Sequence, residues 1–159
     1  MEGETEGRDW AYRAFVEAAR AVDKAYPYPG VGVIIVEEGR IVASAHNGEP
    51  GEPHAETKAL NEARTKAKDL TQAVLYTNLE PCVNVGLTHS CAEEIVHSGI
   101  QEVHIALEDP YYLVRGKGTM FLRGAGLTVT VGEYAEQARW QNKRYFDRFC
   151  PNCGWPIKD

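Results

Sequence analysis

The pattern of hydrophobic and polar positions divides the first part of the chain into a helix, a loop and a pair of strands. Residues 8–25 carry hydrophobic side chains at helical spacing among charged ones, which predicts an amphipathic helix. Two prolines within residues 26–30 exclude a helix there and predict an extended loop. Residues 31–36 form a continuous apolar run, typical of a strand that is buried on both faces. A turn at residues 37–40 then predicts that residues 41–45 return as an antiparallel strand.

The rest of the chain predicts helices and strands in alternation. A loop rich in glycine and proline, residues 46–53, leads to a helix that starts at His54. The same patterns predict further strands at residues 73–79, 103–107 and 127–131, and further helices at residues 91–98, 118–123 and 133–149. Because helices follow strands repeatedly, we expect an α/β protein with crossover connections and a largely parallel sheet that has helices on both faces.

Composition favours one globular domain. The chain has 159 residues, of which 43% are hydrophobic and 25% charged. We assign residues 8–149 to the domain, residues 1–7 to a disordered tail and residues 150–159 to a tail with a Cys-x-x-Cys motif. A net charge of −6 without a basic run argues against nucleic-acid binding, and no apolar stretch approaches the ~20 residues of a membrane helix. The N-terminus lacks the apolar region of a secretory signal and the cysteines suit a reducing compartment, so we expect a cytoplasmic protein.

Two short stretches carry residues that suit a catalytic zinc site. The first contains His54 and Glu56, and the second contains Cys82, with Cys91 nine residues later. A catalytic zinc keeps three protein ligands in a tetrahedral arrangement and a water in the fourth position. His54, Cys82 and Cys91 would supply the three ligands, and Glu56 would be the acid/base that does not bind the metal.

The expected helix starts explain how these residues could meet. On a regular helix, side chains that are two residues apart point to opposite sides. In the first turn, however, side chains lean back over the N-terminal end, so His54 and Glu56 can share a site there. Ser90 and Glu93 have the spacing of a capping box, which places Cys91 in the first turn of its helix. A helix N-terminus favours the thiolate form that binds metal.

Other interpretations stay open. An isolated His-x-Glu can be a solvated helix start, and two cysteines can be buried apolar side chains or, outside the cell, a disulfide. His89 is a candidate fourth ligand, which would make the zinc structural. The conjunction of all these residues at helix starts favours a zinc site, and its order, H-x-E followed by P-C and a second Cys, is that of the zinc-dependent nucleobase deaminases.

From Tyr28 to Phe146 the sequence resembles the deaminase domain of the bifunctional riboflavin-biosynthesis deaminase/reductase, within the cytidine deaminase-like superfamily. The resemblance rests on four short stretches, Val31-Gly32-Val33-Ile34-Ile35-Val36, Gly51-Glu52-Pro53-His54-Ala55-Glu56, Leu79-Glu80-Pro81-Cys82, and Glu108-Asp109-Pro110 with Gly116-Lys117-Gly118. Eight residues separate the two cysteines, as in that family, whereas cytidine, guanine and tRNA adenosine deaminases normally have two. The resemblance implies a three-layer α/β/α sandwich with a five-stranded mixed sheet, a Zn²⁺ ion, and hydrolytic removal of an amino group from a pyrimidine ring. We also expect a homodimer and a small heterocyclic substrate.

The departures from the family fall among the residues that would contact substrate. Tyr28 stands where the family usually has asparagine, Asn84 where it has histidine and Leu87 where it has an arginine suited to binding phosphate. Tyr28, His46 and Asn84 are candidate substrate contacts, although each could be an ordinary loop residue. We therefore predict a zinc-dependent deaminase of a small aminopyrimidine-type ring with altered substrate recognition. The alternatives are a nucleoside, nucleotide or guanine deaminase, and a binding protein that kept the zinc fold without turnover.

The C-terminal tail contains a second candidate metal site. Cys150 and Cys153 have the spacing of one knuckle of a zinc ribbon, but a structural zinc needs four ligands. Another subunit could complete the set, or histidines such as His97 or His104 could, or the two thiols could be free.

Overall fold

A five-stranded mixed sheet forms the centre of the protein. The computed structural model describes residues 9–83, 90–111 and 114–149 of the chain. The strand order is β2-β1-β3-β4-β5. The strands are β1 (Gly32–Glu37), β2 (Arg40–His46), β3 (Val74–Thr77), β4 (Glu102–Ile105) and β5 (Thr128–Val131). The predicted five-stranded mixed sheet is therefore confirmed.

The sheet is less parallel than the sequence pattern predicted. β1 pairs antiparallel with both β2 and β3, and only the pairs β3–β4 and β4–β5 are parallel. The reason is the hairpin at the start of the sheet. The crossover through the next helix carries β3 past β2 to the far side of β1, so β3 runs parallel to β2 but lies beside the strand of opposite direction.

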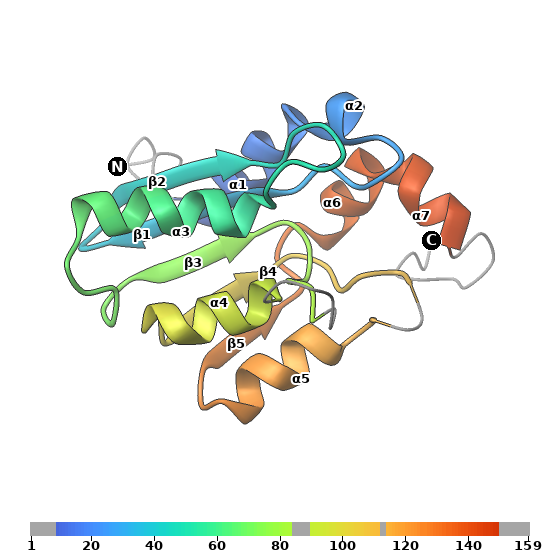
Figure 1. Ribbon diagram of the computed structural model, residues 1–159. Coiled ribbons are helices and arrows are strands. Elements are labelled where there is room, and N and C mark those ends of the chain that lie inside the picture. The colour runs from blue at the N-terminus through green and yellow to red at the C-terminus, as the bar shows by residue number, and fades with distance from the viewer. Residues whose placement is uncertain (1–8, 84–89, 112–113, 150–159) are drawn as a thin grey trace, which may run out of the picture.

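Helices cover both faces of the sheet, as predicted (Figure 1). α3 (Ala55–Lys66), α4 (Cys91–Ser98) and α5 (Lys117–Gly124) lie on one face. The other face carries α1 (Trp10–Ala19), which packs on β1 and β3 and contacts α6 (Ala135–Gln141). α2 (Val22–Ala25) and α7 (Lys143–Phe149) are the two remaining helices in the described part of the chain. Within the described ranges, no helix has the length and apolar character that crossing a membrane requires.

Two helices predicted as continuous are each divided. Residues 8–25 give α1 and α2, separated by a tight turn in which the Ala21 amide bonds to the Ala18 carbonyl at 2.9 Å. Residues 133–149 give α6 and α7, which break at Asn142. The Asn142 side chain is 3% exposed and bonds to both the amide and the carbonyl of Gly30 at 2.8 Å. A long-range hydrogen bond, which periodicity does not encode, thus decides this break.

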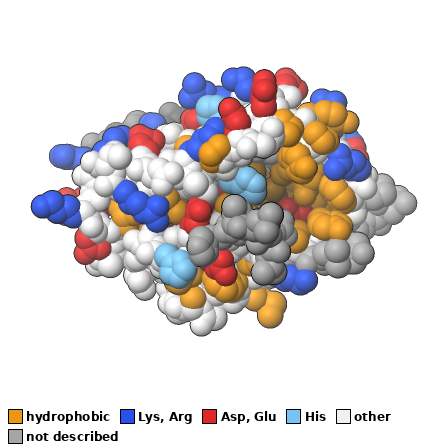
Figure 2. Space-filling view, in the orientation of Figure 1, with side chains coloured by type: hydrophobic (Ala, Val, Ile, Leu, Met, Phe, Trp, Pro, Cys, Tyr) orange, Lys and Arg blue, Asp and Glu red, His pale blue; other side chains and the backbone are white. Residues whose placement is uncertain are grey.

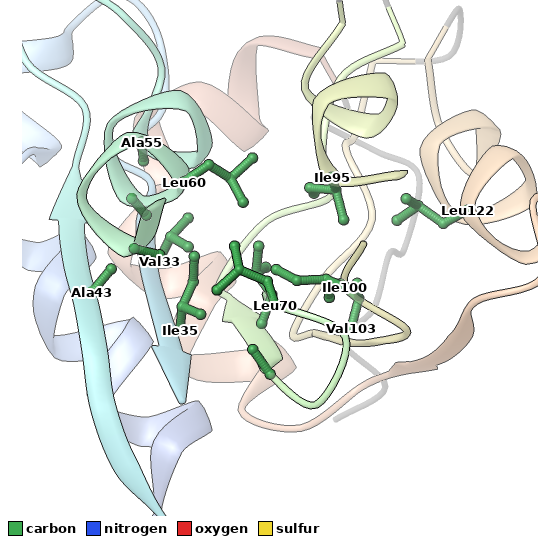
Figure 3. Close-up of a cluster of buried hydrophobic side chains, with 14 of the residues drawn as sticks. Val33, Ile35, Ala43, Ala55, Leu60, Leu70, Ile95, Ile100, Val103 and Leu122 are labelled. Atoms are coloured by element: carbon green, nitrogen blue, oxygen red, sulfur yellow. The ribbon is translucent and has the colours of Figure 1, made fainter. Parts of the chain in front are cut away.

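The main core lies between the sheet and α3, α4 and α5 (Figure 3). α3 packs close to the sheet because small side chains, Ala55, Ala59 and Ala63, recur every four residues on its buried face. Ile95 of α4 and Leu122 of α5 extend the same cluster toward β4 and β5. This packing fixes the N-termini of α3 and α4 relative to the end of β3.

β2 is an edge strand, and part of its free edge is already bonded. The Ser44 amide donates to the Glu62 carboxylate of α3 at 3.2 Å. The helix therefore supplies an acceptor where a neighbouring strand would otherwise be needed.

Candidate active site

The structure brings His54, Cys82 and Cys91 together at the starts of two helices. His54 is the N-cap residue of α3, Cys91 is the first residue of α4, and Cys82 lies in the turn after β3. His54 Nδ1 is 3.2 Å from Cys91 Sγ and 3.8 Å from Cys82 Sγ. The three atoms lie within 4.8 Å of one another, close enough to ligate one ion. One imidazole nitrogen and two sulfurs are donors that suit zinc.

Local capping holds the second cysteine in place. Ser90 and Glu93 form the predicted capping box, with each side chain bonded to the other residue's amide at 3.2 Å. The Cys91 amide points at Cys82 Sγ at 3.5 Å, and the Ala92 amide donates to the Cys82 carbonyl at 3.0 Å. The first turn of α4 therefore aims two backbone N–H groups at the turn that carries Cys82.

The two thiols differ in acidity because they share one proton. A hydrogen bond from the Cys91 thiol lowers the pKa of Cys82 to about 4, and His54 contributes further. The same bond, with burial, raises the pKa of Cys91. The hydrogen bond with Cys82 also raises the pKa of His54 to about 9. Metal binding at these three residues must therefore displace protons from Cys91 and His54.

Glu56 lies buried beside this group. It is 4% exposed and stands in the first turn of α3, two residues after His54. Burial, with the negative charge of Cys82, raises the pKa of Glu56 to about 7. A carboxyl group with a pKa near neutrality can both take and give a proton at physiological pH, as a general acid/base must.

The predicted substrate contacts have different surroundings. Tyr28 is 58% exposed in the loop before β1, so its ring is accessible. His46 ends β2, and its Nδ1 pairs with Glu17 of α1 at 2.7 Å. Ala45 beside it faces the α3 core, so His46 points to the opposite face of the sheet, and this favours a structural role for it. Asn84, His89, Cys150 and Cys153 lie outside the described residues.

Glu80, to which the sequence patterns gave no role, lies at the centre of several contacts. Its carboxylate is 6% exposed and accepts backbone N–H groups of Asp109, Gly116 and Thr119, each at 3.0 Å. Asn78 is similarly buried and bonds to the Gly30 carbonyl and the Gly32 amide at 2.9 Å each. The signals in the sequence were the polar character of both residues at the end of a predicted strand and, for Glu80, its place in the Leu79-Glu80-Pro81-Cys82 stretch.

Residues 6–107 match the family model described as the cytidine and deoxycytidylate deaminase zinc-binding region. The chain is 45% identical over 121 residues to the riboflavin biosynthesis protein RibD of Aquifex aeolicus, a match that covers 76% of this chain and 33% of that protein. It is 41% identical over 122 residues to the diaminohydroxyphosphoribosylamino-pyrimidine deaminase of Buchnera aphidicola, which covers 77% of this chain and 81% of that one.

A solved structure shows the same similarity. The deaminase/reductase of Thermotoga maritima superposes with a TM-score of 0.86 at 33% identity, over 92% of this chain and 42% of that one. The match to the Aquifex aeolicus RibD protein spans about a third of that protein's length.

Proposed function

Since this chain belongs to the cytidine and deoxycytidylate deaminase family, and within it to the RibD-type deaminases, we propose that it deaminates a small aminopyrimidine-type ring by zinc-dependent hydrolysis. The observation that carries the proposal is the buried Glu56 carboxyl group beside the convergent His54, Cys82 and Cys91 side chains. A structural site has no need of an acid that does not bind the metal. In this proposal the three side chains hold zinc, and Glu56 moves protons.

The charges of the donor set explain why a base is needed. Two thiolates and a neutral imidazole cancel the charge of a divalent ion, so the ion acidifies a water molecule less than an all-histidine set would. When bound, zinc would supply Lewis-acid polarisation of that water. Glu56, with a pKa raised to about 7, can accept the proton that the water loses.

Glu56 serves the reaction twice. It first takes a proton from water and passes it to a ring nitrogen, while the water oxygen bonds to the carbon that carries the amino group. It then takes the remaining hydroxyl proton and gives it to the amino nitrogen as the carbon–nitrogen bond breaks. Ammonia leaves and the ring keeps a carbonyl oxygen, so atoms and charge balance.

We further propose that the preferred substrate lacks the charged ribosyl phosphate that the name of the Buchnera aphidicola relative specifies. Leu87 and Asn84, both outside the described residues, replace side chains that could bind a phosphate. The exposed Tyr28 supports the same proposal.

Hydrophobic side chains gather over the segment after α2 and over α7 (Figure 2). Rings of Tyr111, Tyr145 and Phe149 pack together there, with centroid distances of 5.1 Å and 4.9 Å to Phe149.

Ammonia release from a substrate panel tests the proposal. Zinc-loaded protein is offered aminopyrimidines, pterins, cytidine and guanine, together with the diaminopyrimidine in phosphorylated and dephosphorylated form, and Glu56→Gln serves as the inactive control. Turnover of an aminopyrimidine with a higher kcat/KM for the dephosphorylated form is the expected result. A strong preference for the phosphorylated form would overturn the specificity proposal, and Lys117, which begins α5, would then be the first phosphate contact to examine.

Other outcomes of the panel separate the alternatives. Turnover confined to cytidine or guanine would identify a nucleoside or guanine deaminase. Zinc binding without ammonia release from any compound would favour a binding protein. The homodimer and the cytoplasmic location stay predictions, and sedimentation velocity of the zinc-loaded protein tests the first.

A further inference from the structure

We propose that Glu80 is a positioning residue that joins the turn carrying Cys82 to the start of α5 and to the loop between β4 and α5. β3 and β4 are parallel neighbours, so the segments after them leave the sheet at the same edge. Cys82 comes after β3, and residues 106–116 come after β4. Ligands of α/β proteins bind at this edge, so the loop after β4 borders the substrate position of the proposed function, on which this inference rests.

Glu80 supplies the cap that α5 lacks. The N-cap residue of α5 is Gly116, which has a φ of 75° and no side chain to accept the N–H groups of the first turn. Glu80 Oε2 accepts the Gly116 amide and Oε1 accepts the Thr119 amide, both at 3.0 Å. A carboxylate at this position also interacts favourably with the helix dipole. The cap therefore comes from a residue far away in sequence, two positions before a candidate metal ligand.

The same carboxylate holds the loop that leads to α5. Oε2 accepts the Asp109 amide at 3.0 Å, and the Glu80 amide donates to the Leu107 carbonyl at 2.9 Å. Asp109 in turn accepts a hydrogen bond from the Tyr145 hydroxyl of α7 at 3.1 Å. Glu80 thus links the end of β3 to both ends of the loop after β4.

Close packing leaves this arrangement little freedom. A Cβ at Gly118 would lie 2.1 Å from the Pro81 carbonyl oxygen, a distance that real Cβ atoms do not adopt. The backbone of α5 therefore lies directly against the turn that carries Cys82. Because the three bonds to Glu80 all come from backbone amides, its role is to hold the loop rather than to react with substrate.

The test compares Glu80→Gln with Glu133→Gln, the same change at a side chain that is 60% exposed. An amide oxygen can replace only one carboxylate oxygen, and the amide nitrogen would face N–H groups of the loop. Zinc-loaded Glu80→Gln is expected to keep its zinc, to exchange the amides of Asp109, Gly116 and Thr119 about tenfold faster or more, and to raise KM about tenfold with kcat within about threefold. Glu133→Gln is expected to match the unmodified protein in all three measurements.

Unchanged exchange of the Asp109, Gly116 and Thr119 amides would overturn the proposal, and so would a loss of kcat at constant KM, since that would make Glu80 a catalytic residue. If Glu80→Gln does not fold, Glu80→Asp is measured instead. It keeps the charge and both oxygens, so a smaller rise in exchange and KM is expected, and no rise in either overturns the proposal. Hydrogen exchange and zinc content do not depend on turnover. Failure of the proposed function would therefore appear as an inactive panel while the exchange result still decides the role of Glu80.

Discussion

The two sides of the candidate active site are held in place in different ways. On the metal side, local features place His54, Glu56 and Cys91, because helix starts and a capping box lie next to them in sequence. The fourth residue of this side, Cys82, lies in the turn after β3. On the loop side, residues 26–32, the backbone is held by side chains from distant segments.

Asparagine side chains make most of these contacts on the loop side. The Gly30 amide donates to Asn142, and the Gly30 carbonyl accepts from both Asn142 and Asn78. The Val31 amide donates to Asn47, whose own side chain donates to the Pro29 carbonyl, both at 2.8 Å. A loop that packs against a core must satisfy its backbone groups, and amide side chains do so without adding charge. Short motifs can thus place candidate metal ligands, while the loop of residues 26–32 depends on contacts across the whole chain.

The largest effect is expected from removing a ligand on the metal side. Cys82→Ala leaves two donors where zinc needs at least three protein ligands, so the purified protein should hold about one zinc per chain fewer than the unmodified protein and show no ammonia release. Elemental analysis after dialysis measures this. Asn142→Ala, on the loop side, is the matched control and should keep its full zinc content. Full zinc in Cys82→Ala would show that the ligand set is wrong.

The next effect concerns the proposed acid/base. Glu56→Gln keeps the size of the side chain but cannot carry the proton, so turnover should fall by ~10²–10⁴-fold while zinc content is unchanged. Steady-state ammonia release on the best panel substrate gives the ratio. A rate close to that of the unmodified protein would reduce Glu56 to a buried residue of the helix start.

The pH dependence of stability distinguishes the two sides. The metal side contains Glu56, which can titrate, whereas the backbone of the loop side is held by neutral amides. In zinc-free protein the pKa of Glu56 is raised from 4.5 to about 7, so the folded state binds more protons than the unfolded state between these values. Stability relative to Glu56→Gln should therefore fall as pH rises from 4.5 to 7, by about 3 kcal/mol in all. Urea unfolding of both proteins across this range measures the difference. A difference that stays constant with pH would contradict the burial effect.

The smallest effect is expected on the loop side. Asn142→Ala leaves the Gly30 amide without its acceptor in a buried position, which should lower the free energy of unfolding by about 2 kcal/mol. Because Tyr28 lies in the same loop, KM should rise more than kcat falls. Thermal unfolding and steady-state kinetics measure the two effects. An equal loss of kcat and kcat/KM would instead place the loop in the chemical step.

The features that could be predicted from the sequence show the same division. The strand pair before His54, the helix starts and the Ser90–Glu93 capping box were predictable because each depends on neighbouring residues. The break at Asn142 depends on a partner 112 residues away and the role of Glu80 on partners 29, 36 and 39 residues away, so no local pattern revealed them. His46 stays a predicted substrate contact, suggested by its position in a loop-like stretch, and its partner Glu17 in α1 is likewise distant in sequence.

The bond between Ser44 and Glu62 bears on how copies of the chain could assemble. An edge strand can recruit a strand from a second molecule only if its outward N–H groups are free to pair. At Ser44 that group is already bonded to α3 of its own chain, and a second strand would have to displace the Glu62 carboxylate. Sheet extension across β2 is therefore disfavoured at Ser44, and the expected homodimer should associate through another surface.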